Sequence, residues 1–172
     1  MKNSDWREQF LEKVSKCSVE GKEAVEYIRA HKTHIGIKRA RKSVGAFWTL
    51  QKSAHLNSLY YSPESSLVDP GAWTLLIHEV RHLQQGYLMA LSIYGELDAW
   101  QYQLRLYKKI TTKQLHPVQE ELLSLPLNTD RENLHRARLL MIKSAGKSYG
   151  AGLLPLYPIH HEIRYWLTGR NS

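Results

Sequence analysis

The chain of 172 residues contains a single cysteine, Cys17, and no apolar run long enough to cross a membrane. One cysteine can form neither an intramolecular disulfide nor a cysteine-only zinc site, which favours a reducing compartment. Glycine and proline are also few, with 10 and 6 residues, and no short unit recurs. These absences exclude transmembrane, collagen-like, disordered and repeat architectures, and predict one globular domain over residues 1–172.

Acidic residues are outnumbered by basic ones, 16 to 24, and the formal net charge is +8. Basic residues concentrate in two places, in a segment at 38–42 and on an expected helix at 131–143. Such clusters are typical of solvated surfaces and also of polyanion-binding surfaces, so nucleic acid is a candidate partner. The N-terminal residues 1–8 carry mixed charge without an apolar core. We therefore expect no secretory signal, no membrane association and a cytoplasmic protein, although signal-independent export is compatible with the same sequence.

The spacing of apolar residues predicts an α+β fold that is mostly helical. Two short helices are expected between Asp5 and Ala30, with Gly21 as the interruption. Alternating apolar residues between Ile35 and Tyr61 predict a small antiparallel sheet of about three strands. Helices are expected after the sheet at 69–86, 95–110, 117–125, 129–145 and 159–167.

The helix at 69–86 has the clearest boundaries, because Asp69 can cap its start, Pro70 suits its first position and Gly86 can end it. A capping box formed by Thr129 and Glu132 is expected at the start of a later helix.

The chemistry of the chain centres on His78, Glu79 and His82, which form a His-Glu-x-x-His motif inside the helix at 69–86. On an α-helix His78 and His82 are separated by about 40° and Glu79 lies about 60° from His82, so both imidazoles can reach one metal ion. Two histidines one turn apart form half of a tetrahedral zinc site, and a catalytic site needs one more protein ligand. We predict that Glu96, at the start of the next helix, is this third ligand and that Glu79 is the general base.

These residues resemble the zincin metallopeptidases, and in particular the gluzincins, over roughly residues 57–110. The second gluzincin motif, Glu-x-x-Ala, is matched by Glu96 and Ala99. The resemblance implies a zincin-like fold in which a small sheet precedes the motif helix and a second helix carries the third ligand. It also implies that the segment from Asn57 to Tyr61 is an edge strand beside the cleft.

The chain departs from the gluzincin pattern where many members have an acidic residue, four positions after the ligand glutamate. Trp100 occupies this position, so support for a ligand histidine must come from elsewhere. Asp98 is an alternative third ligand, because the segment from Gly95 to Asp98 is similar to the start of the aspzincin motif.

The resulting hypothesis is a zinc-dependent metallopeptidase that acts on a peptide or protein substrate, with the oligomeric state left open. The oxyanion donor is one of several residues in the C-terminal segment: Tyr149, Tyr157, His160, His161 and Arg164. The alternative is a non-catalytic or regulatory zinc-containing module whose basic surface binds nucleic acid or an acidic partner. A toxin or effector with the same zinc chemistry is a third possibility.

Overall fold

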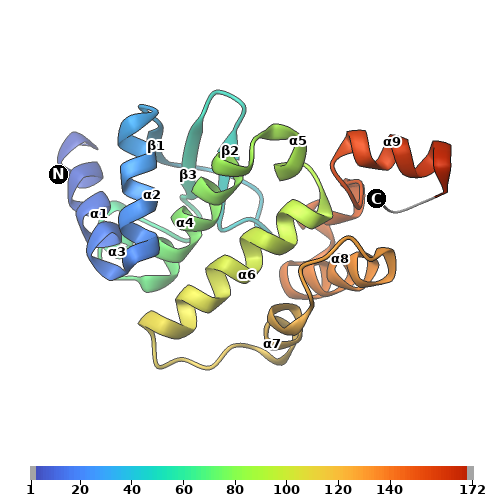
Figure 1. The fold of residues 1–172 in the computed structure, drawn as a ribbon. Coiled ribbons are helices and arrows are strands. Elements are labelled where there is room, and N and C mark those ends of the chain that lie inside the picture. The colour runs from blue at the N-terminus through green and yellow to red at the C-terminus, as the bar shows by residue number, and fades with distance from the viewer. Residues whose placement is uncertain (1–2, 170–172) are drawn as a thin grey trace.

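The computed structural model describes residues 3–169 of the chain (Figure 1). Helices dominate, and a small three-stranded sheet precedes the central helices in the sequence. The predicted α+β class with mostly helical content is therefore confirmed. No helix within residues 3–169 combines the length and the apolar character that a membrane span requires.

Helices α1 (Asn3–Cys17) and α2 (Val19–Ala30) form the N-terminal part, but Gly21 does not separate them. The break lies at Ser18, whose side chain accepts a hydrogen bond from the Gly21 backbone N–H at 2.9 Å. Inside α2, a Cβ atom on Gly21 would lie 2.1 Å from the carbonyl oxygen of Val14. Gly21 therefore permits close contact between α1 and α2, and its prediction as a helix breaker is wrong.

The sheet contains β1 (His34–Lys38), β2 (Ala46–Thr49) and β3 (Ser53–Asn57) in the order β1-β3-β2. Strands β2 and β3 form an antiparallel hairpin, whereas β1 runs parallel to β3. The sheet is thus mixed, and the prediction of an antiparallel sheet is wrong. Alternating apolar residues identify extended segments but not their direction or order. Strand β3 is the most completely buried of the three, which favours its central position.

Asn57 ends β3 and organises the loop between β1 and β2. Its Oδ1 accepts hydrogen bonds from the backbone N–H groups of Ala40 and Leu59, and its Nδ2 donates to the carbonyls of Arg41 and Val44. The chain turns immediately afterwards, so the predicted strand from Asn57 to Tyr61 does not form. Strand β3 is paired on both sides, so β1 and β2 are the edge strands. Of these two, β2 is the one that packs against the helix at Pro70–Gln85.

The remaining elements are helical. After the sheet the chain forms, in order, α3 (Pro63–Ser66), α4 (Pro70–Gln85), α5 (Tyr87–Ala90), α6 (Ile93–Ile110), α7 (Pro117–Ser124), α8 (Arg131–Ala145), the short 3₁₀ helices η1 (Lys147–Tyr149) and η2 (Ala151–Leu153), and α9 (Ile159–Thr168). Helix α8 begins at Asp130, whose side chain accepts from the Asn133 backbone N–H at 2.8 Å. The predicted capping box at Thr129 is therefore wrong, because the aspartate one residue later caps the helix.

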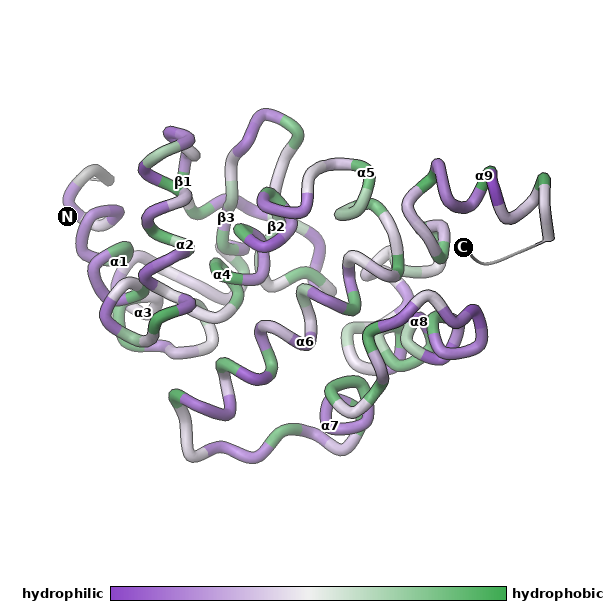
Figure 2. The backbone as a smooth tube through the Cα atoms, viewed as in Figure 1, coloured by the Kyte–Doolittle hydropathy of each residue, from purple (hydrophilic) through white to green (hydrophobic). Residues whose placement is uncertain are grey.

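The buried apolar residues form two clusters, one that includes α4 and one that includes most of α6. These two helices pack against each other (Figure 1). The first cluster joins α1, α2, the sheet and α4, and the second joins most of α6 to α7, α8 and the segment after α8. Figure 2 shows hydrophobic and hydrophilic residues alternating along α6 and α8, as expected for helices with one buried face. The contact between α4 and α6 is the part of the fold that positions the candidate site.

Candidate metal centre

Helix α4 carries all three motif residues, and both of its ends are well defined. The side chain of Asp69 accepts a hydrogen bond from the Gly71 backbone N–H at 2.7 Å, Pro70 occupies the first turn, and Gly86 ends the helix with a φ angle of 76°. The predicted boundaries are therefore confirmed. Apolar residues of α4 face the first core cluster, while His78 and His82 face α6.

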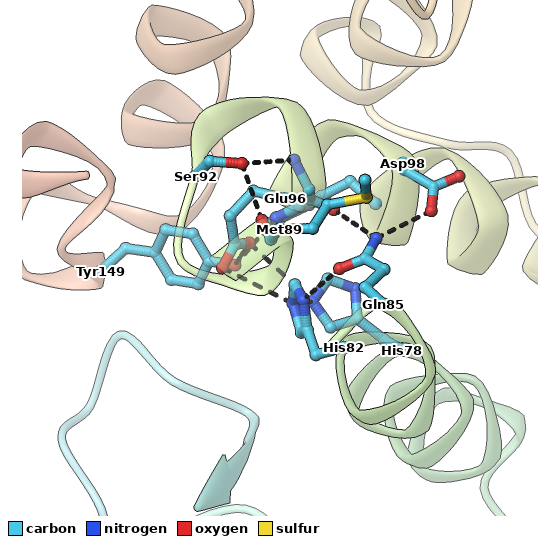
Figure 3. A network of polar contacts seen from close by, with 10 residues as sticks. His78, His82, Gln85, Met89, Ser92, Glu96, Asp98 and Tyr149 are labelled. Carbon is cyan, nitrogen blue, oxygen red and sulfur yellow. Dashed lines mark hydrogen bonds and ion pairs between the residues drawn. The ribbon is translucent and has the colours of Figure 1, made fainter. Parts of the chain in front are cut away.

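His78, His82 and Glu96 converge at the contact between α4 and α6 (Figure 3). The two Nε2 atoms are 3.1 Å apart. Glu96 places Oε1 3.5 Å from Nε2 of His82 and Oε2 4.0 Å from Nε2 of His78. Zinc bonds of the usual length in a tetrahedron give ligand separations of about 3.3 Å, so the three side chains fit such an ion after small adjustments. The structure thus brings together all three residues that the sequence analysis selected as metal ligands.

The cluster is well shielded from solvent, since His78 is 4% and His82 2% exposed. Burial, and secondly the neighbouring His82, lower the pKa of His78 well below the ordinary imidazole value, and contacts with Ala99 and Gln103 offset only part of this. His78 is therefore neutral near pH 7, which is the form of histidine that binds metals.

Glu79, the predicted general base, lies beside the cluster and is only 5% exposed. Burial raises the pKa of Glu79 well above the ordinary carboxyl value, the nearby Glu96 carboxylate adds to the rise, and the backbone of Trp48 in β2 partly opposes it. A carboxylate with a raised pKa accepts protons more readily, which is the property required of a general base. No metal ligand role is indicated for Glu79, because it is not part of the converging group.

Tyr149 is the one member of the five predicted oxyanion donors that the structure places at the cluster. Its hydroxyl donates a hydrogen bond to Oε2 of Glu96 at 2.6 Å and accepts one from Nε1 of Trp100 at 2.9 Å. Burial and the Glu96 carboxylate raise the pKa of Tyr149 well above 10, so the hydroxyl keeps its proton. The other four lie elsewhere, since Tyr157 donates to the carbonyl of Thr129 and His160, His161 and Arg164 are exposed on α9.

Asp98, the alternative third ligand, does not join the converging group. Its carboxylate instead accepts hydrogen bonds from Arg81, with Nε at 2.8 Å and Nη2 at 3.3 Å. Nε2 of Gln85 also donates to Asp98, at 2.7 Å. Gln85 in turn contacts His82, a link that the sequence analysis missed, although the three-residue spacing places both on one face of α4.

A cleft of about 350 Å³ opens onto His78, Glu79 and Tyr149. It lies between the start of β2, α4, α6 and the segment after α8. Neutral polar side chains form much of its wall: Ser43, Thr74, Gln103, Gln114, Gln119 and Ser144. Neither lysine nor arginine lines it among the described residues, despite the net charge of +8. The cleft is therefore suited to an uncharged, hydrogen-bonding ligand.

Comparison with known proteins adds no further constraint, since no protein-family model, no curated protein and no solved structure matches this chain.

Proposed function

We propose that this protein is a zinc-dependent metallopeptidase, with His78, His82 and Glu96 as metal ligands. The observation that carries the proposal is the convergence of these three side chains beside a cleft that is lined by His78 and by the buried Glu79. Two imidazole nitrogens and one carboxylate oxygen form the ligand set of catalytic zinc sites, which leave a further position open. The gluzincin resemblance of the motif residues agrees with this assignment.

When bound, zinc supplies Lewis acidity that polarises the scissile carbonyl and lowers the pKa of a water molecule. Glu79 would accept a proton from the attacking water, which its raised pKa favours, and would then pass this proton to the leaving amine. Tyr149 remains protonated, and its hydroxyl, which donates to Glu96 in the structure, would supply a donor to the substrate oxygen by turning away from Glu96.

The surroundings of the site favour a peptide substrate. Strand β2 borders α4 and pairs on one side only, so its free edge could align an extended peptide by backbone hydrogen bonds. Trp48 of β2 lies near the site, with its ring 6.1 Å from the ring of His82 between centroids. The neutral wall of the cleft favours peptides with uncharged polar side chains and disfavours a polyanion at this position.

The direct test is peptide hydrolysis by the zinc-loaded protein and by Glu79→Gln. We expect the variant to retain zinc and to lose activity by a factor of about 10²–10⁴, the usual contribution of a general base. The exposed Glu132→Gln, with the same change in charge and shape, is the matched control and should retain full activity. Equal activity of wild type and Glu79→Gln would refute the assignment.

A second candidate function is regulatory binding through the basic segment at the end of β1 and in the loop that follows it, because Lys38, Arg39, Arg41 and Lys42 are all exposed. In that case the metal is structural, and the protein binds an acidic partner or nucleic acid with an affinity that falls steeply as salt increases. Binding would then be unaffected by Glu79→Gln, which separates this function from hydrolysis.

A further inference from the structure

A chain of polar contacts runs across the interface from α6 to His82 (Figure 3). Oε1 of Gln85 lies 3.1 Å from Nδ1 of His82. On the other side, Nε2 of Gln85 donates to the carbonyl of Gly95 at 2.9 Å and to Asp98 at 2.7 Å. Arg81 completes the chain by holding the Asp98 carboxylate through two hydrogen bonds.

These contacts determine which way the Gln85 amide faces. The carbonyl of Gly95 and the carboxylate of Asp98 are both acceptors, so only the NH₂ group of Gln85 can face them. Reversing the amide would place its oxygen against two acceptors and its NH₂ group against His82. Oε1 therefore faces Nδ1 of His82, and since a carbonyl oxygen can only accept, this nitrogen must carry the imidazole proton.

We propose that Gln85 is a positioning residue that fixes His82 in its Nδ1–H tautomer, and that Asp98 and Arg81 act through Gln85. This tautomer leaves the lone pair on Nε2, the atom that faces His78 and Glu96. The proposal rests on the metal-site function proposed above and assigns a role to three residues outside the ligand set, Gln85, Asp98 and Arg81. It also explains how the site can have Trp100 four positions after Glu96, where many gluzincins have an acidic residue. In this chain a ligand histidine is supported by Gln85 on α4 instead.

The two histidines differ in this respect. Nδ1 of His78 is buried and has no partner in hydrogen-bonding geometry within the described part of the chain. We therefore expect His82 to be preorganised for metal binding and His78 to be oriented by its surroundings, which include the nearby Ala99 backbone, the Gln103 side chain and the edge-on contact with the Trp100 ring at 6.1 Å.

The proposal is tested by ¹⁵N NMR of histidine-labelled, metal-free protein at about pH 8.5, two units above the ordinary imidazole pKa. The shifts of the ring nitrogens report the tautomer. We expect His82 to be in the Nδ1–H form in wild type and in a mixture of forms in Gln85→Leu. The exposed neighbour Gln84→Leu is the matched control and should behave as wild type. A wild-type His82 in the Nε2–H form, or no change in Gln85→Leu, would overturn the proposal.

Zinc affinity, measured by chelator competition, gives the second readout. Gln85→Leu should weaken binding by a factor of about 10–100, Asp98→Ala should weaken it less, and Gln84→Leu should leave it unchanged. If zinc binds equally to all variants, the positioning role is wrong while the metallopeptidase proposal stands. If wild type binds no zinc but His82 shows the expected tautomer, the metallopeptidase proposal fails while the role of Gln85 stands.

Discussion

Replacing Tyr149 by phenylalanine removes one oxygen atom from the site and leaves the ring in place. The ring packs edge-on against Trp100, with centroids 5.8 Å apart, and this contact survives the change. Two hydrogen bonds are lost, the one donated to Glu96 at 2.6 Å and the one accepted from Trp100 at 2.9 Å. The variant therefore separates the chemistry of the hydroxyl from the packing of the side chain.

The cost in stability can be worked out from these two bonds. A hydrogen bond to a carboxylate contributes about 1.5–3 kcal/mol, and leaving the indole N–H unpaired costs about 1–3 kcal/mol. Because the two hydrogen bonds share one hydroxyl and their contributions are not additive, we expect a net loss of about 2–3 kcal/mol in the free energy of unfolding. Urea denaturation of the metal-free protein measures this value.

The expected loss of catalytic activity is larger than the loss of stability, and it is measured separately. If the hydroxyl stabilises the oxyanion, its removal should lower kcat by a factor of about 10²–10³ with little change in KM, in a folded, zinc-loaded enzyme. Tyr107→Phe is the matched control, because Tyr107 lines the same cleft but lies outside the cluster. A kcat within about threefold of wild type would refute the role of Tyr149 in the transition state.

Two further predictions concern other parts of the chain. Asn57→Ala removes four hydrogen bonds made by a fully buried side chain. We expect urea denaturation to show a loss of about 3 kcal/mol in the free energy of unfolding, and a loss below about 1 kcal/mol would contradict the role of Asn57 in the loop. Burial raises the pKa of the Cys17 thiol, so at pH 8 it should be alkylated more slowly than free cysteine, and an equal or faster rate would contradict its half-buried environment.

The motif helix and the ligand set could be predicted because their signals are local or follow from simple topology. The spacing of His78 and His82 defines one helix face, and Asp69 and Gly86 mark the helix ends within the same short segment. Glu96 opens the next long helix after a connection of a few residues, which allows that helix to return across the first.

Contacts between distant segments could not be predicted in the same way. Tyr149 reaches Glu96 across 53 residues, and no pattern in the sequence distinguishes it from the other four donors in its region. The direction of β1 was mistaken for a similar reason, because alternation records burial on one face but not whether neighbouring strands run parallel or antiparallel. Asn57 likewise ends β3 through contacts with a loop that precedes it by more than ten residues.

Elemental analysis of untagged protein shows whether His78, His82 and Glu96 form a metal site. Wild type should carry about one zinc ion per chain, His78→Ala should carry little, and His135→Ala, which changes an exposed helical histidine, should match wild type. Wild-type protein that remains metal-free after zinc is offered, or equal zinc content in wild type and His78→Ala, would contradict the account.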